Sequence, residues 1–146
     1  MKAPRRRGAR EFATSAPATI FLVDDDDSFR RLLAKQLVAH GYAVVEAGDG
    51  AAALEWLAIT ADGEGTPPDV VVLDVSMPGY SGLGILKAMR GFAARPPTLI
   101  ITGFRDSSVD VLARNLGAAR VLHKPVDLDD VLDAVLDAIL RRSATA

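Results

Sequence analysis

Residues 70–82 read VVVLDVSMPGYSG, a run of branched apolar residues that ends on a carboxylate and then changes to Pro and Gly. A continuous apolar run bounded by turn residues predicts a strand buried on both faces of a sheet, with Asp74 at its carboxyl end. In open parallel sheets, ligands bind at that edge. We therefore expect the chemistry of the chain to centre on Asp74.

The composition of the 146 residues is that of one globular domain. Hydrophobic residues make up 49% of the chain and charged residues 25%, and no apolar run is long enough to cross a bilayer, so we do not expect a membrane protein. The absence of cysteine excludes disulfides, thiolate metal sites and thiol catalysis. A reducing cytoplasm is therefore the expected compartment.

Charge is distributed unevenly along the chain. Five basic residues against Glu11 give the first nineteen residues a charge of +4, which leaves −6 for the rest of a chain whose net charge is −2. No apolar segment follows this basic start, so it does not resemble a signal peptide. We interpret residues 1–18 as a disordered basic tail that is most simply inert. Contact of this tail with an anionic partner is the alternative, but nucleic acid is not an expected partner of the chain.

From Thr19 onward, short apolar runs alternate with amphipathic segments. The apolar runs predict strands at residues 20–23, 42–46, 70–74, 97–102 and 119–123. The segments that follow them predict helices from Asp27 or Ser28 to His40, over about 49–59, over 83–89, from Ser107 or Ser108 to Gly117, and over 128–140. The apolar face of the fourth helix is the weakest of the five.

The first and last predicted helices have the clearest apolar faces. The first is expected to turn Phe29, Leu32, Leu33 and Leu37 inward. The last carries apolar residues at i, i+3, i+4, i+7, i+8, i+11 and i+12, namely Leu128, Val131, Leu132, Val135, Leu136, Ile139 and Leu140.

Five strands that are each followed by a helix predict an α/β fold, a doubly wound (βα)5 sandwich with a parallel sheet covered on both faces. Right-handed crossovers leave few topologies, and the flavodoxin-like strand order 2-1-3-4-5 is the common one at this size. In that order strands one and three are neighbours, so Asp24, Asp25 and Asp74 are expected to converge. Thr102 and Lys124 end two further strands at the same edge.

Three carboxylates at neighbouring strand ends repel one another unless a cation neutralises them or a proton is taken up. Oxygen ligands without His or Cys favour Mg²⁺. A carboxylate beside such a metal can act as a nucleophile toward phosphorus, and Lys124 and Thr102 can supply a positive charge and a hydroxyl to a phosphoryl group on Asp74. Each residue alone also has an ordinary interpretation. Asp24 to Asp27 could form a solvated loop with a helix cap, and the capping role suits Asp27 best. Asp74 could be a turn former, Lys124 a surface lysine and Thr102 an ordinary strand residue. Their joint occurrence at four strand ends favours the functional interpretation.

The chain resembles the receiver domain of bacterial response regulators, the CheY-like family, over roughly Thr19 to Leu140. The resemblance is carried by FLVDD at 21–25, VLDVSMPGYSG at 72–82, IITG at 100–103 and HKP at 123–125. It implies that Asp74 accepts a phosphoryl group from a phosphohistidine of a sensor histidine kinase or phosphotransfer protein. It further implies that Asp25, Asp74 and the main-chain carbonyl of Ser76 bind Mg²⁺, and that Asp24 acts through a metal-bound water. Thr102 and Lys124 would contact the phosphoryl oxygens. The resemblance also implies that the Lys124–Pro125 peptide bond is cis.

Two positions depart from the pattern of the family. Members usually carry Tyr or Phe three residues before the lysine, where this chain has Val121, and Val126 replaces a frequent Phe. Phosphoryl chemistry needs neither aromatic ring. The change at Val121 affects how phosphorylation is usually transmitted in the family, from Thr102 to the face formed by the fourth helix, fifth strand and fifth helix.

The expected organisation is a receiver domain over residues 19–141 and a short tail at 142–146, with no output domain attached. We expect a stand-alone signalling module that catalyses only its own phosphorylation and dephosphorylation and is not otherwise an enzyme. Its kinase is expected to bind around Phe29 and Leu33. The phosphorylated module would then contact an unknown protein target. The alternatives are a phosphorylation-independent interaction module of the same fold and a Mg²⁺-dependent phosphatase of small molecules. The phosphatase would typically carry a second Asp in the place of Ser76. A homodimer that pairs Asp129, Asp133 and Asp137 with Arg114 and Arg120 is left open.

Overall fold

The computed structural model describes residues 16–77, 81–93 and 95–145, so most of the predicted basic tail and Pro78 to Tyr80 of the Asp74 motif lie outside the described residues. Strands and helices alternate along the chain. They are β1 (Thr19–Val23), α2 (Asp27–Ala39), β2 (Ala43–Ala47), α3 (Gly50–Ala61), β3 (Val70–Asp74), α4 (Gly82–Met89), β4 (Thr98–Thr102), α5 (Ser107–Asn115), β5 (Arg120–His123) and α6 (Leu128–Thr145).

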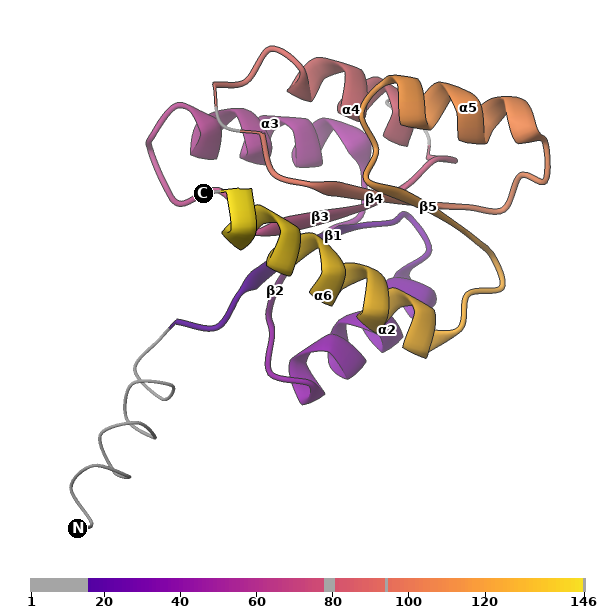
Figure 1. Cartoon of the computed structure of the whole chain (residues 1–146), viewed down its shortest axis with the longest axis horizontal. Helices are drawn as coiled ribbons and strands as arrows, with labels where there is room; N and C mark the ends of the chain where they lie inside the picture. Colours follow the sequence, from indigo (N-terminus) through magenta and orange to yellow (C-terminus); the bar gives the residue numbers. More distant parts are fainter. Residues whose placement is uncertain (1–15, 78–80, 94, 146) are drawn as a thin grey trace, which may run out of the picture.

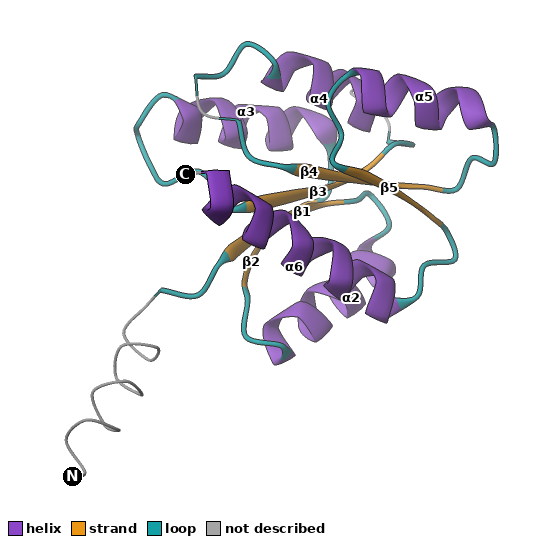
Figure 2. Ribbon diagram, viewed as in Figure 1, coloured by secondary structure: helices purple, strands orange, loops and turns teal. Residues whose placement is uncertain are grey.

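The five strands form one parallel sheet in the order β2-β1-β3-β4-β5, which confirms the predicted topology. Figures 1 and 2 show α2 and α6 on one face of this sheet and α3, α4 and α5 on the other. In the register of the sheet Val23 pairs with Leu73 and Ile101 with Asp74. The residues that follow β1, β3 and β4 therefore emerge at one edge of the sheet.

The core consists of two layers because successive strand residues point to opposite faces. In β1, Ile20 and Leu22 pack with the layer under α2 and α6, whereas Phe21 and Val23 pack with the layer under α3 to α5. The residues of β3 and β4 alternate in the same way, and every residue of these two strands is buried. Burial on both faces explains why these strands read as continuous apolar runs.

Helix α2 differs from the prediction at its start and in its inward face. The N-cap is Asp26, whose side chain accepts from the Phe29 N–H, and not Asp27 or Ser28. Leu33 and Leu37 are buried as predicted, but Leu32 is 60% exposed. Arg30 takes the predicted place of Leu32 among the buried residues of the helix, because its guanidinium has partners at the edge of the sheet.

Helix α6 is longer than predicted, and the residues that it turns toward the sheet differ in part from the predicted ones. It runs to Thr145 and so includes most of the expected tail. Its buried residues are Val131, Ala134, Val135 and Ala138, while Leu136 and Leu140 are 49% and 59% exposed. Ala134 and Ala138 belong to the core layer under α2 and α6, whereas Leu136 and Leu140 do not, so the predicted stripe was wrong at these two leucines.

The remaining elements agree with the prediction to within a few residues. The segment with the weak apolar face is helix α5, which has Ala113 as its buried residue. Gly41 and Gly117, the predicted stops of α2 and α5, adopt positive φ values of 95° and 100°, which suit glycine. The Lys124–Pro125 peptide bond is cis, as the resemblance implied. Within the described ranges, no helix is both long enough and apolar enough to span a membrane.

Candidate functional site

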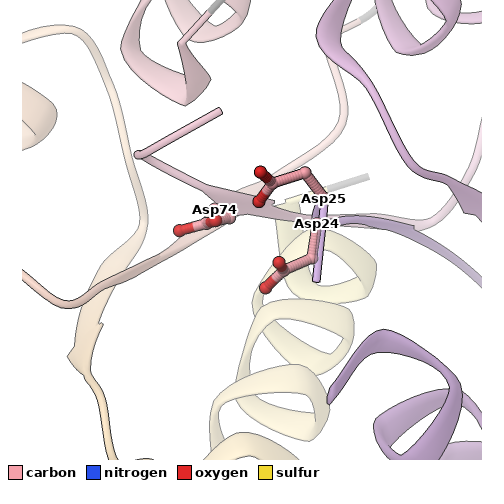
Figure 3. A group of neighbouring side chains, drawn as sticks. All are labelled: Asp24, Asp25 and Asp74. Atoms are coloured by element: carbon pink, nitrogen blue, oxygen red, sulfur yellow. The ribbon is translucent and has the colours of Figure 1, made fainter. Parts of the chain in front are cut away.

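Three carboxylates converge where β1 and β3 end. Oxygen atoms of Asp24, Asp25 and Asp74 all lie within 4.8 Å of one another, and Figure 3 shows the three side chains around a common space at the sheet edge. Asp24 and Asp74 are only 2% and 4% exposed, whereas Asp25 is exposed. The convergence that strand order predicted is thus present, with two of the three carboxylates removed from water.

Lys124 brings a positive charge to this cluster from the end of β5. Its Nζ lies 3.1 Å from Asp24 Oδ2 and 3.8 Å from Asp74 Oδ2. The Lys124 N–H donates to the Thr102 carbonyl (2.8 Å), so the residue is tied to the end of β4 as it leaves the sheet. One ammonium therefore faces two buried carboxylates and leaves the cluster acidic.

The electrostatics of the cluster act most strongly on Asp74. Burial raises the pKa of Asp74 from 3.8 to about 6, and the nearby Asp24 and Asp25 carboxylates act in the same direction. Lys124 and the Ser76 N–H, which donates to Asp74 Oδ1 (3.3 Å), partly oppose this rise in pKa. A buried carboxylate with a raised pKa that faces a cation at a sheet edge is typical of a functional group.

The loop that carries the acidic pair is held by Arg30, which sequence reasoning missed. Its guanidinium donates to the main-chain carbonyl of Asp24 (2.7 Å), to Asp27 Oδ1 (2.8 Å) and to Glu46 Oε1 (3.0 Å). Arg30 is 8% exposed, which is unusual for a cation unless it is paired. The available signal was its spacing, since Arg30 precedes Leu33 by three residues and Leu37 by seven and so shares their buried face.

Thr102 and Ser76 lie where they were predicted, but their predicted contacts remain untested. Thr102 ends β4, is fully buried, and its Oγ accepts from the Phe104 N–H (2.9 Å). Ser76 follows β3 by two residues and contacts Asp74 through its own N–H. The roles of the Thr102 hydroxyl toward a phosphoryl group and of the Ser76 carbonyl toward a metal stay predictions.

Gly82 fixes how the chain returns after β3. The Gly82 N–H donates to the Val75 carbonyl (3.1 Å), and a Cβ at this position would collide with the main-chain oxygen of Asp74. Only glycine allows this close approach. The start of α4 is thereby packed against the residue at the centre of the cluster.

An apolar groove lies between α2 and the start of α6. Its lining residues are Phe29, Leu32, Leu33, Gln36, Val126 and Leu128. The ring of Phe29 belongs to both features, because Lys124 Nζ lies 4.7 Å from its centroid. Phe29 is half-buried and Leu33 is 5% exposed, so at the predicted kinase contact the exposed apolar surface comes from Leu32 and not from Leu33.

The family model of the response regulator receiver domain matches residues 20–136 of the chain. The chain belongs to the response regulator receiver domain family. The relatives of this receiver domain include the transcriptional regulatory protein KdpE of Mycobacterium tuberculosis, with 34% identity over 87% of this chain and 53% of the relative. The transcriptional regulatory protein FixJ of Azorhizobium caulinodans is 39% identical over 86% of this chain and 56% of the relative. The chain thus spans about half the length of these curated relatives.

Solved structures agree with this assignment. The crystal structure of a response regulator receiver domain protein from Clostridium thermocellum matches with a TM-score of 0.77 and 29% identity, over 88% of this chain and 99% of that one. The signal receiver domain of NarL from Mycobacterium tuberculosis matches with a TM-score of 0.74 and 30% identity, over 86% and 98%. Accepting a phosphoryl group is the role of this family, whose receiver domains are generally signalling modules and not enzymes.

Proposed function

We propose that Asp74 is the phosphoacceptor of this receiver domain. The observation that carries the proposal is the buried Asp74 carboxylate facing Lys124 and Asp24 at the end of β3. One oxygen of Asp74 attacks the phosphorus of a phosphohistidine, forming a P–O bond while the P–N bond breaks. The electron pair of that bond stays on the imidazole nitrogen, which takes up a proton, and Asp74 becomes an acyl phosphate.

The residues of the cluster fit Mg²⁺ as the cofactor. Asp24, Asp25 and Asp74 offer three carboxylate oxygens within 4.8 Å, and this donor set of oxygen alone suits a hard divalent cation. The Ser76 carbonyl is the predicted third direct protein ligand beside Asp25 and Asp74, with Asp24 acting through a water. Bound Mg²⁺ would neutralise charge on the cluster and on the phosphoryl group.

Lys124 and Thr102 are the groups of the chain that act on the phosphoryl oxygens in this proposal. The Lys124 ammonium already lies 3.8 Å from Asp74 Oδ2, so a short movement brings it to an oxygen of the phosphoryl group. The Thr102 hydroxyl, held at the end of the neighbouring strand, retains its own O–H as a donor. Both groups bind the developing negative charge without taking part in bond making.

The partners follow from this role. A cytoplasmic sensor histidine kinase or phosphotransfer protein donates the phosphoryl group, and the apolar groove of Phe29, Leu32 and Val126 beside Lys124 is its docking surface. A further protein then binds the phosphorylated form. The chain itself catalyses only its own phosphorylation and the hydrolysis of its phosphorylated aspartate. A homodimer is a further proposal, supported by exposed acids on α6 and by the exposed Arg114 and Arg120.

One observation favours a second candidate, an interaction module that works without phosphorylation. Val121 occupies the position where the family usually has a mobile aromatic ring, and it is 8% exposed in the core layer under α3 to α5. A buried valine has no large ring to rotate when a neighbouring group is phosphorylated. The intact set of Asp24, Asp25, Asp74, Thr102 and Lys124 nevertheless supports phosphoacceptance.

The proposal is tested by intact mass after incubation with acetyl phosphate, with and without Mg²⁺. We expect the wild type to gain one phosphoryl group only with Mg²⁺, and Asp74→Asn to gain none. The matched control is Asp137→Asn, which makes the same change at an exposed carboxylate of α6 and should be phosphorylated like the wild type. A folded wild type without an adduct, even briefly at low temperature, would favour the phosphorylation-independent module.

A further inference from the structure

We propose that Phe29 is a positioning residue for Lys124, and that the face of its ring holds the Lys124 ammonium inside the acidic site. Lys124 Nζ lies 4.7 Å from the centroid of the Phe29 ring, within the range of a cation–π contact. The same nitrogen is 3.1 Å from Asp24 Oδ2 and 3.8 Å from Asp74 Oδ2. The ammonium is thus held by two carboxylates and one aromatic ring.

The ring is itself held in place by the first turn of α2. The Phe29 N–H donates to the capping carboxylate of Asp26 (3.1 Å), and the side chain packs, half-buried, against the core layer under α2 and α6. The next residue, Arg30, donates to the Asp24 carbonyl (2.7 Å). One helical turn therefore positions both the acidic pair and the lysine that faces it.

An aromatic ring suits this task better than an aliphatic or polar side chain. Lysine has a long flexible stem and a strongly hydrated ammonium, and the Lys124 side chain is 28% exposed, so water competes for the cation. A ring attracts the cation through its quadrupole but presents no lone pair of its own. The three N–H donors of Lys124 therefore stay available to Asp24, Asp74 and the oxygens of a phosphoryl group.

The contact also gives the apolar groove a route to the chemistry. Phe29 lines that groove together with Leu32, Val126 and Leu128, so it is the residue at which the groove and Lys124 meet. The expected effect of Phe29 on the rate of phosphorylation rests on the proposed function of Asp74. The contact of ring and ammonium can be tested apart from it.

The kinetic test measures the rate of phosphorylation by acetyl phosphate with saturating Mg²⁺, a small donor that needs no docking. Phe29→Leu keeps an apolar side chain but removes the ring, and the rate should fall about three- to tenfold. Phe29→Tyr retains the ring face and should stay within about twofold of the wild type. The control Val38→Ala shortens an exposed apolar side chain of the same helix and should leave the rate unchanged.

A double-mutant cycle separates positioning from packing. In a Lys124→Met background there is no cation for the ring to hold, so Phe29→Leu should change the remaining rate by less than about twofold. An equal loss in both backgrounds, or a failure of Phe29→Tyr to keep the rate, would overturn the proposal. Unfolding midpoints are measured for each variant, and Phe29→Met replaces Phe29→Leu if the latter does not fold.

The contact is read directly from the NMR shifts of the Lys124 ε-methylene protons. The ring current should move these protons upfield in the wild type and in Phe29→Tyr, and the shift should return toward the value of free lysine in Phe29→Leu. Unshifted protons in the wild type would overturn the contact. If the wild type takes up no phosphoryl group while its protons are shifted, the proposed function fails and the contact stands.

Discussion

Two groups of aspartates in this molecule have opposite environments. Asp24, Asp25 and Asp74 end parallel strands, and two of them are almost completely buried beside Lys124. Helix α6 carries a similar density of aspartates, at 129, 130, 133 and 137, all of them exposed. The Asp137 carboxylate, 51% exposed, pairs with Arg141 one turn later (2.9 Å).

The comparison shows that topology, and not the number of acids, makes the site. A parallel sheet brings strand ends from distant parts of the chain to one edge, where neighbouring backbone limits access of water. On α6 the carboxylates point away from the buried stripe and are solvated. Burial that raises the pKa of Asp74 to about 6 is the physical mark of the first environment.

The largest expected effect is on the stability of Asp74→Asn without metal. Because the folded state raises the pKa of Asp74 from 3.8 to about 6, the folded protein binds this proton more tightly than the unfolded chain. The stability from this group is fully present below pH 3.8 and is lost as pH rises through about 6. At pH 8 Asp74→Asn, which cannot ionise, should therefore be more stable than the wild type by about 3 kcal/mol.

Urea unfolding at several pH values, with EDTA present, measures this difference in the free energy of unfolding. The advantage of Asp74→Asn should shrink toward zero as the pH falls below 3.8, where the wild-type carboxyl becomes protonated in the unfolded as well as in the folded state. Adding Mg²⁺ at pH 8 should stabilise the wild type and narrow the gap. A gap that did not vary with pH would mean that burial of the Asp74 charge is not its cause.

The next largest effect is expected for Arg30→Met, which removes the support of the acidic loop. The change leaves the buried Asp24 carbonyl without its donor and removes the cation from Asp27 and Glu46. The loss of stability should be about 2 kcal/mol, the cost of a buried group left without its partner. Apparent affinity for Mg²⁺ should fall as well, because the backbone that orients Asp24 is no longer fixed.

The matched control is Arg31→Met, the same substitution at the exposed neighbouring residue. Its stability should stay within about 0.5 kcal/mol of the wild type, as for most surface changes. The two variants are compared by thermal unfolding and by Mg²⁺ titration. Similar losses in both would show that Arg30 contributes only general surface charge.

Most of the fold could be predicted because a doubly buried strand has a distinctive sequence. The runs at β1, β3 and β4 contain almost no polar residue before the strand end, so the sites of Asp24, Asp74 and Thr102 follow from where each run stops. Strand order then predicts that the acids converge. The raised pKa of Asp74 depends on how completely the edge is covered, which the pattern does not specify.

Helix rotation and capping were harder to predict because several residues compete for the same role. Each aspartate from 24 to 27 can cap a helix, and Asp26 does so while Asp27 pairs with Arg30. On α6 the stripe of Leu and Val residues covers more of the helix surface than the face that is buried against the sheet. That buried face includes Ala134 and Ala138, which the apolar pattern did not single out. Arg30 was missed because a periodic search for apolar residues passes over a buried cation.

The smallest expected effect is on the stability of Asp137→Asn, the same chemical change made on α6. The pair with Arg141 spans one helical turn, and both side chains are more than half exposed, so its loss should cost at most about 0.5 kcal/mol. The difference from the wild type should disappear in about 1 M salt, where charges a few ångströms apart are screened. Urea unfolding at pH 8 measures it beside Asp74→Asn. If Asp137→Asn also became markedly more stable than the wild type, net negative charge and not burial at the strand ends would explain the behaviour of Asp74.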